Sequence, residues 1–546
     1  MPNAAQALVE ILHRNGIDRV FCVPGESFLG IMDALHDSPI DVVTARHEAS
    51  AGFMAVADAR LTARPGVLLV SRGPGATNAA IALHTAEQDA VPLILIVGQI
   101  EKKDLRREAF QEIDYGRMYG GIAKWVTEAI DAEQVPELTA KAVRIATSGT
   151  PGPVVLVIPE DLQFPEAPMP AGVVQARRPS VPAPQDIADV RASLEKAQRP
   201  LIIAGGGMDV PGGREALLAF AERWNVPVAV SFRRQDLFPN AHPLYAGDLG
   251  LANPKQQIAT FQDSDLILAL GTRLGDITTQ NYSFPDYPRP RQALVHCHDD
   301  SRIIGQHFIA DVGIAASPKA LAEALADGTS LPARDWSGKV RALYEAYATW
   351  TVKTAPDGVV FGNVVHALNE VLEEDGIVVA DAGTLSSHVY RHVPFRYPQR
   401  LLAPISGAMG YGVPGAVAAA LRHPGRQVVC LVGDGGFMMT GSEFMTAVAR
   451  KLPLLILLSN NSSYASIRIH QERHYPGRVV ATDLVNPDFA ALARAYGAAG
   501  YSIEREEDIR PVLREAVQAT GPRLVEVKAS LETYLPAAVS RANAAD

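Results

Sequence analysis

The segment RQVVCLVGDGG, residues 426–436, is followed by a second apolar run, LPLLILLSNN, residues 452–461. A helical pattern, GSEFMTAVARK, lies between them at 441–451. Short runs that are apolar on both faces are typical of parallel strands covered by helices on each side. Strand, helix and strand in this order indicate a βαβ unit, whose two strands end at the same edge of one sheet.

The residues that close these two strands predict a metal-bridged diphosphate site. Asp434 follows the first strand and Asn461 ends the second, so a carboxylate and an amide oxygen should lie side by side. Such oxygens suit Mg²⁺, which keeps phosphate and water ligands. Gly435 and Gly436 let backbone N–H groups approach a phosphate at a helix start. The alternative is a tight strand–helix turn with a capping aspartate.

Composition excludes several classes of protein. The chain has 546 residues, a net charge of −10 and 47% apolar residues, which favours a folded protein over a disordered one. The charge gives no electrostatic case for nucleic acid or an anionic membrane. Cys22, Cys297 and Cys430 are too far apart for a disulfide framework or a cysteine zinc site. Neither a membrane span nor a signal peptide is evident, so we expect a soluble, cytoplasmic protein.

The βαβ pattern recurs along the chain and predicts three α/β domains, each a doubly wound parallel sheet. A proline-rich linker at 159–186 and looser breaks at 327–338 and 354–360 give domains at 1–165, 187–330 and 358–546. Expected strands are 18–25, 40–48, 66–75 and 91–99 in the first domain, 200–207 and 264–276 in the second, and 375–383, 426–436 and 452–461 in the third. Expected helices are 49–63, 76–89, 410–422 and 441–451.

Two turns of the first domain stand out. Glu48 lies where a strand meets an apolar helix and should be partly buried, so it needs a hydrogen bond or a proton. The GPGATN turn at 73–78 ends another strand. Taken alone, Glu48 is also explained as a first-turn glutamate favoured by the helix dipole, and GPGATN as an ordinary helix start.

Together these motifs resemble the thiamine-diphosphate (ThDP) enzymes of the acetolactate synthase and pyruvate oxidase group. The matching segments are VPG (23–25), RHE (46–48), GPGATN (73–78), VGQ (97–99), AFQEID (109–114), GAMGYGVP (407–414), GDGG…NN (433–461) and NPDFAALARAYG (486–497). The resemblance implies pyrimidine-binding, central and diphosphate-binding domains, in that order. It also implies active sites between subunits, and hence a homodimer or homotetramer.

The resemblance assigns roles to individual residues. Glu48 would hydrogen-bond N1′ of the aminopyrimidine, the Gly407 carbonyl would accept the 4′-amino group, and Met409 would separate the two rings. Asp434, Asn461 and the Ser463 carbonyl match the Mg²⁺ ligands. The full cofactor-binding set that it implies is Pro24, Gly25, Glu48, Thr384, Gly407, Met409, Gly433, Asp434, Gly435, Gly436, Asn461, Ser463 and Tyr464.

The implied reaction is that of a lyase or carboligase. An enamine formed from a small, pyruvate-like 2-oxo acid by decarboxylation would be transferred to a 2-oxo acid or aldehyde acceptor. Gln111 matches a side chain near the reacting carbon and joins Glu48 as a catalytic residue. Lys124 also matches a family position, with a structural role as the alternative. The chain has no His-His doublet, which favours carboligation over simple aldehyde release.

Two residues depart from the acetolactate synthase pattern at the predicted substrate pocket. Glu26 stands where a glycine is usual and, with Ser27, could add polar groups; a capped helix start is the alternative. His470 stands where a tryptophan recognises the acceptor, which leaves an acceptor other than a plain 2-oxo acid open. With Gln111, these residues form the expected pocket.

The central domain leaves the cofactor set open. ThDP and Mg²⁺ are expected, whereas FAD is less favoured, because GGG (205–207) and GTRLGD (271–276) precede a weak flavin pattern. Alternatives on the same scaffold are a 2-hydroxyacyl-CoA or aldehyde lyase and a flavin-coupled oxidase. A silent paralogue is disfavoured by Glu48, Asp434 and Asn461. Sequence does not specify the substrate, the choice of dimer or tetramer, or a regulatory subunit.

Overall fold

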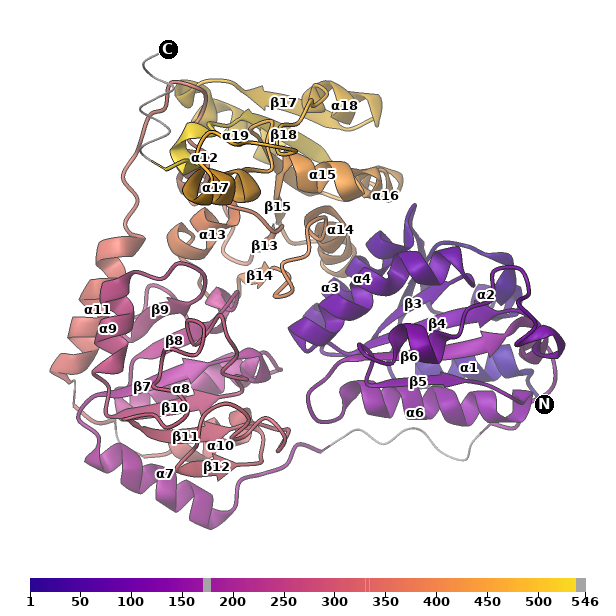
Figure 1. The fold of residues 1–546 in the computed structure, drawn as a ribbon, viewed down its shortest axis with the longest axis horizontal. Coiled ribbons are helices and arrows are strands. Elements are labelled where there is room, and N and C mark those ends of the chain that lie inside the picture. Colours follow the sequence, from indigo (N-terminus) through magenta and orange to yellow (C-terminus); the bar gives the residue numbers. More distant parts are fainter. Residues whose placement is uncertain (170–177, 329, 333, 537–546) are drawn as a thin grey trace.

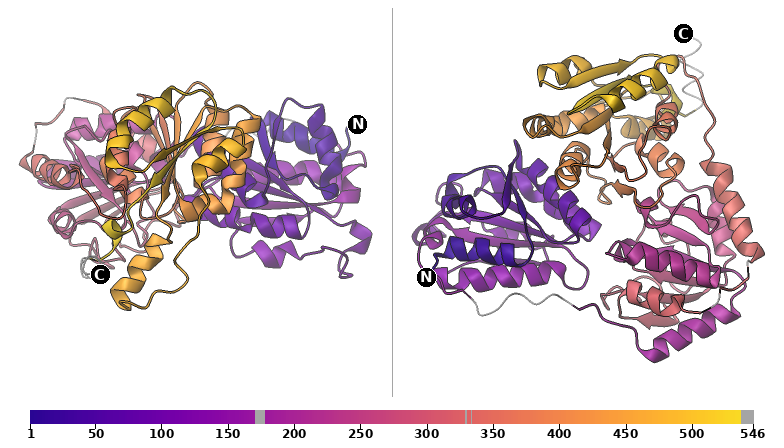
Figure 2. Two further views of the ribbon diagram at one scale, coloured as in Figure 1. Left: turned by 90° about the horizontal axis from the view of Figure 1, so that it is seen from above. Right: turned by 180° about the vertical axis from the view of Figure 1, so that it is seen from behind.

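The computed structural model describes residues 1–169, 178–328, 330–332 and 334–536. They form three six-stranded sheets with helices on both faces, and every named strand pair is parallel, which confirms the predicted fold class. The domains lie at the corners of a triangle, and the third adjoins both of the others (Figure 1, Figure 2). Part of the predicted proline-rich linker, 170–177, lies outside the described residues.

The first sheet has the order β2-β1-β3-β4-β6-β5. Its strands are β1 (Arg19–Cys22), β2 (Asp41–Thr44), β3 (Gly66–Val70), β4 (Leu93–Gln99), β5 (Trp125–Glu128) and β6 (Pro153–Pro159). Its helices are α1 (Ala4–Arg14), α2 (Leu29–His36), α3 (Glu48–Thr62), α4 (Pro74–Asp89), α5 (Tyr115–Tyr119) and α6 (Val135–Thr147). Leu68 packs on the core side that contains α3 and α4, and its neighbour Leu69 on the side of α1 and α6, as expected of a strand covered on both faces.

The central sheet has the order β12-β11-β10-β7-β8-β9. Its strands are β7 (Pro200–Ala204), β8 (Val228–Ser231), β9 (Tyr245–Leu249), β10 (Leu266–Leu270), β11 (Ala293–Cys297) and β12 (Val312–Ile314). Its helices are α7 (Pro184–Lys196), α8 (Gly213–Trp224), α9 (Lys255–Gln262), α10 (Pro318–Ala326) and α11 (Asp335–Ala348). Helix α11 follows residue 330, and its Trp336 and Val340 are buried in the core of this domain.

The third sheet has the order β14-β13-β15-β16-β18-β17. Its strands are β13 (Ile377–Ala380), β14 (Arg400–Leu402), β15 (Val428–Gly433), β16 (Leu454–Asn460), β17 (Ala499–Ile503) and β18 (Arg523–Lys528). Its helices are α12 (Phe361–Leu368), α13 (Ser386–His392), α14 (Gly412–Arg422), α15 (Asp434–Thr440), α16 (Phe444–Ala449), α17 (Ala465–His474), α18 (Phe489–Ala495) and α19 (Ile509–Gln518). The helix expected at 441–451 is present as a 3-10 turn at Gly441–Glu443 followed by α16. The sequence did not predict α15, which begins at Asp434, inside the range expected for the strand at 426–436.

Apolar packing between α3 and α14 joins the first and third domains. One buried cluster contains side chains of both helices, and the rings of Phe53 and Tyr411 meet edge to face at 5.7 Å between centroids. Helices α3 and α14 face each other across the domain boundary in Figure 1. None of the helices in the described ranges has the length and hydropathy needed to cross a bilayer.

The close crossing of α3 and α4 gives a stability prediction. A Cβ at Gly52 would lie 2.2 Å from the Cβ of Ala82, so Gly52→Ala should force the two helices apart. Overpacking of this kind costs about 1–3 kcal/mol, and we expect a lower melting temperature by calorimetry. Gly121→Ala is the control, because a Cβ there meets nothing within 4 Å. Equal melting temperatures for the two variants would contradict the prediction.

Candidate active site

Asp434 is the buried carboxylate of the third domain. It lies at the junction of β15 and α15 with 3% of its surface exposed. Its Oδ1 accepts the Gly435 N–H at 2.9 Å and its Oδ2 accepts the Asn486 amide at 2.8 Å. Burial raises the pKa of Asp434, and these hydrogen bonds oppose the rise. Because both of these donors are neutral, a cation is the group that would balance this charge.

Asn460, the last residue of β16, and Asn461, which follows it, have different environments. Asn460 is buried: its Nδ2 donates to Glu526 at 2.6 Å, and its Oδ1 accepts from Asn486 at 2.9 Å. Asn461 is half-buried, and its Oδ1 accepts the Ser463 N–H at 3.1 Å. Asn460 therefore supports the site, and Asn461 is the member of the pair nearer the surface. Asn486 begins the matching segment NPDFAALARAYG but had no individual role in the sequence argument; its amide donates to both Asp434 and Asn460.

These donors fit a hard cation. Mg²⁺ prefers oxygen ligands. Three such groups are available here: the Asp434 carboxylate, the Asn461 amide oxygen and the Ser463 main-chain carbonyl. Among the described residues, no cluster of three or more histidine, cysteine or acidic side chains could hold a metal ion. A site at Asp434 would therefore complete its coordination with phosphate and water oxygens, as Mg²⁺ commonly does.

The glycines after Asp434 are required by what lies beneath them. A Cβ at Gly435 would lie 2.5 Å from the Tyr464 ring, and a Cβ at Gly436 would lie 3.0 Å from Asp381 Oδ2. Gly433 precedes them as the last residue of β15, and all three sit at the start of α15. Packing thus accounts for both glycines, and the turn that results has no side chain at 435 or 436 to block a phosphate.

Asp381 was not singled out from the sequence, although it organises this end of the site. Its carboxylate is fully buried and accepts the N–H groups of Gly410 at 3.0 Å and Gly412 at 3.2 Å. Burial raises its pKa to about 6. One side chain therefore supports both the turn at Gly436 and the segment that contains Met409. The only sequence signal was its position directly after the apolar run of β13.

The predicted cofactor residues around this segment are accessible. Gly407 is exposed with φ +71°, and a Cβ there would meet nothing within 4 Å. Met409 and Thr384 are half-buried. The Gly410 carbonyl accepts the Thr440 hydroxyl at 2.8 Å, which ties this segment to the end of α15.

In the first domain, the two turns noted in the sequence meet. Glu48 begins α3 half-buried, and its Oε2 accepts the Asn78 amide at 2.9 Å. A Cβ at Gly75 would lie 3.2 Å from Glu48 Oε1, so the GPGATN turn packs directly on this carboxylate. Gln111, with φ +65°, packs on Gly73 of the same turn. The structure thus gathers Glu48 and Gln111 at one corner of the first domain, in a different domain from Asp434.

The loop after β1 divides into buried and exposed residues. Gly25 packs on Ser71, where a Cβ would lie 2.6 Å from the serine Cβ, and Pro24 is exposed. Ser27 is fully buried, and its hydroxyl accepts the Arg72 N–H at 3.2 Å. The side chain of Glu26 is 75% exposed.

The structure also shows the contacts of two other residues that the sequence singled out, Lys124 and His470. Lys124 donates to the carbonyls of Ile145, Ser148 and Thr150 around the end of α6, which supports its structural role. His470 is exposed on α17, and its ring stacks on His474 with centroids 6.4 Å apart.

The central domain borders a cavity of about 1090 Å³, whose lining includes Arg60, Gly206, Asp209, Arg234, Arg273 and His298. The GGG motif there has a packing explanation. A Cβ at Gly205 would lie 2.5 Å from the Gly271 carbonyl oxygen, and a Cβ at Gly207 would lie 2.7 Å from Gly271 Cα. The ends of β7 and β10 therefore approach too closely for side chains, whether or not a ligand is bound.

Comparison with known proteins agrees with this architecture. Models of the thiamine pyrophosphate enzyme N-terminal TPP-binding, central and C-terminal TPP-binding domains match residues 2–118, 187–325 and 381–527. The chain is 32% identical over 544 residues to the acetolactate synthase large subunit of Parasynechococcus marenigrum, covering 96% of this chain and 87% of the relative. It is 29% identical over 528 residues to the isozyme 2 large subunit of Escherichia coli, covering 96% and 95%.

These matches define the class: the chain is a thiamine-diphosphate-dependent enzyme. Within that class it belongs to the acetolactate synthase group, as the resemblance in the sequence had indicated.

Asp434 provides a test of the metal site. Asp434→Ala removes the buried carboxylate, so ThDP affinity measured calorimetrically in Mg²⁺ should fall about 100-fold or more. Asp508→Ala, at the start of α19 in the same domain, serves as control and should bind as the wild type does. Unchanged affinity in Asp434→Ala would contradict the assignment.

Proposed function

We propose that this chain is a ThDP- and Mg²⁺-dependent carboligase that decarboxylates a small, pyruvate-like 2-oxo acid and transfers the remaining fragment to a carbonyl acceptor. Membership of the acetolactate synthase group makes it a ThDP-dependent enzyme of carbon–carbon bond formation. The observation that carries the proposal is the buried carboxylate of Asp434, whose hydrogen-bond donors are neutral, above a turn of glycines at a helix start.

The proposed cofactor-binding residues lie in two domains, the first and the third. ThDP, when bound, supplies a carbon nucleophile and accepts the electron pair released as CO₂ leaves. Asp434, Asn461 and the Ser463 carbonyl would hold Mg²⁺, and the main chain of Gly435 and Gly436 would hold the diphosphate.

The aminopyrimidine would be held by other groups. Glu48 would hold a proton at N1′, and the Gly407 carbonyl would accept the 4′-amino group. Met409 would keep the two rings bent toward each other, so that the reacting groups stay close. Pro24, Gly25, Thr384 and Tyr464 would complete the walls of the cofactor site.

We further propose that the active site forms between two copies of the chain, in a homodimer or homotetramer. Large apolar side chains beside both halves of the site support this. Phe110, next to Gln111, is 77% exposed, and Met438 and Met439, on α15 after Asp434, are 57% and 52% exposed. Exposed apolar groups in such a position are typical of a protein–protein interface.

The proposed substrate pocket contains Glu26, Ser27, Gln111 and His470. The exposure of Glu26 and His470 supports their contact with substrate, whereas the buried Ser27 would shape the pocket by supporting the loop. A histidine in place of a tryptophan favours carbonyl substrates with a polar group that can hydrogen-bond to the imidazole ring.

The cavity beside the central domain favours a second candidate function. Its size and its arginine side chains suit a nucleotide, as a 2-hydroxyacyl-CoA lyase or a flavin-coupled oxidase would require. The cofactor set that we propose lacks FAD, because the sequence after GTRLGD (271–276) carries only a weak flavin pattern.

One experiment separates these functions. The purified protein is incubated with ThDP, Mg²⁺ and pyruvate, alone and with aldehyde acceptors, and the products are identified by mass spectrometry. Carboligation products support the proposal; free aldehyde alone, or no turnover, contradicts it. A flavin absorbance band in the same preparation would favour the oxidase.

Glu48→Gln tests the proton-holding role. The substitution keeps the shape but removes the ionisable group, so turnover should fall about 100- to 10,000-fold, while ThDP affinity changes little. Glu137→Gln, which alters a first-turn glutamate of α6 in the same domain, is the matched control. Full activity in Glu48→Gln would refute the assignment.

His470→Trp tests the pocket. An indole removes the polar ring and should shift the ratio of aldehyde-derived to pyruvate-derived products, measured in competition. Arg473→Trp, which places an indole at another exposed position of α17, should leave that ratio unaltered. If both variants retain the wild-type ratio, His470 does not contact the acceptor.

A further inference from the structure

The segment 403–406, which leads into Gly407, is held by charged side chains of the other two domains. Arg60, from α3 of the first domain, donates to the Ala403 carbonyl at 3.3 Å. Arg233, after β8 of the central domain, donates to the Pro404 carbonyl. These contacts join the main chain of the third domain to side chains distant in the sequence.

Asp89 makes the remaining main-chain contacts. It is the last residue of α4, it is buried, and its Oδ1 accepts the N–H groups of Ile405 at 2.7 Å and Ser406 at 3.2 Å. One turn earlier, the Thr85 hydroxyl lies 3.2 Å from the Ser406 hydroxyl, which in turn accepts the Ala408 N–H at 3.3 Å. The support from α4 therefore reaches the residue before Met409.

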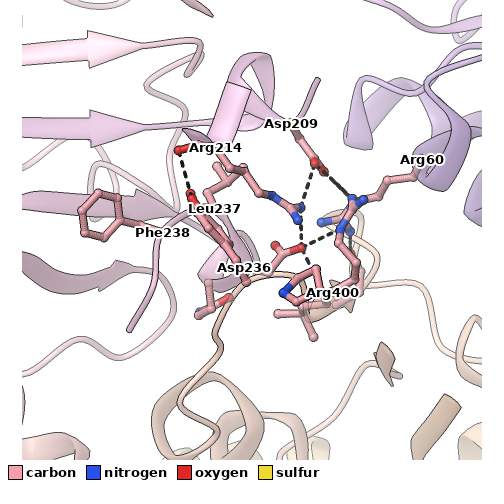
Figure 3. A network of polar contacts seen from close by, with 12 residues as sticks. Arg60, Asp209, Arg214, Asp236, Leu237, Phe238 and Arg400 are labelled. Atoms are coloured by element: carbon pink, nitrogen blue, oxygen red, sulfur yellow. Dashed lines mark hydrogen bonds and ion pairs between the residues drawn. The ribbon is translucent and has the colours of Figure 1, made fainter. Parts of the chain in front are cut away.

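Arg60, which contacts the Ala403 carbonyl, is itself held by a network of buried ion pairs (Figure 3). Arg60 pairs with Asp209 at 3.4 Å, and Asp209 also pairs with Arg400 at 3.0 Å. Arg214 contacts both Asp209 and Asp236, at 2.9 and 2.7 Å. Because Arg400 belongs to β14, the network includes side chains of all three domains and holds the strand directly before the segment.

We propose that Asp89 is a positioning residue for the reaction: by accepting the N–H groups of Ile405 and Ser406, it sets the position of the main chain at Gly407 and Met409. The inference rests on the proposed function, from which the roles of Gly407 and Met409 are taken. It adds a residue of the first domain that acts on the cofactor-facing segment of its own chain.

If Asp89 only stabilised the packing of the domains, its loss should resemble the loss of another buried aspartate at the same domain boundary. Asp58, in α3, is likewise buried and bonds Arg422 of α14 at 2.8 and 2.9 Å. This pair joins the same two domains through side chains alone, at the last residue of α14. Loss of Asp58 should therefore weaken domain packing without moving Gly407.

The test measures deuterium exchange at C2 of bound ThDP, together with kcat, KM for pyruvate and melting temperature. Asp89→Ala should slow exchange and kcat about 10- to 100-fold, as displacement of a reacting group does, with KM within threefold of the wild-type value. Asp58→Ala should lower the melting temperature but keep exchange within about threefold. Asp89→Asn, which retains an acceptor oxygen, should recover most of the exchange rate.

The outcomes separate the two proposals. A wild-type protein that binds ThDP without accelerating C2 exchange would defeat the proposed function and this inference with it. The inference alone would be overturned if the wild type accelerates exchange and Asp89→Ala exchanges at the same rate. It would also be overturned if Asp58→Ala slows exchange as much as Asp89→Ala does. If Asp89→Ala does not fold, Asp89→Leu, which fills the space without an acceptor oxygen, replaces it; a several-fold slower exchange supports the proposal, and an unchanged rate overturns it.

Discussion

The buried carboxylate of Asp434 is the constraint on which the third domain depends. A carboxylate removed from water must be balanced by charge or by strong hydrogen bonds. Here the surroundings supply the Gly435 N–H, the Asn486 amide and the N–H groups of Ser462 and Ser463, all of them neutral. The arrangement leaves the charge available for a cation, and the parallel pairing of β15 with β16 sets the asparagines beside it. An ordinary capping aspartate would not need this burial.

The second constraint is the absence of space for side chains around the site. Tyr464 lies under Gly435, and Asp381 lies under Gly436 and accepts the N–H groups of Gly410 and Gly412. The main chain at Gly435 and Gly436 is therefore buried against these side chains, where a Cβ would not fit. In a low-dielectric pocket such preorganised N–H groups are effective partners for an anion, because they need not reorient when it binds.

Domain packing and site geometry are linked in this molecule. The apolar contact between α3 and α14 brings the first domain against the third, and the ends of α3 and α4 then carry Arg60 and Asp89 to the main chain at 403–406. Polar main-chain groups buried at a domain boundary need partners, and these two side chains provide them. The same helix, α4, begins at the corner that holds Glu48.

Sequence alone determined the three parallel-sheet domains and the chemistry at the strand ends, because apolar runs and glycine turns are local properties of the chain. It placed Glu48 beside no particular partner, and it gave no role to Asn460, Asp381, Asn486 or Asp89. Tertiary structure decided these, since the contacts join residues far apart in the chain: Asp89 and Ile405 are separated by 316 positions. Such contacts arise only when whole domains pack, and no short pattern encodes which buried donor will meet which acceptor.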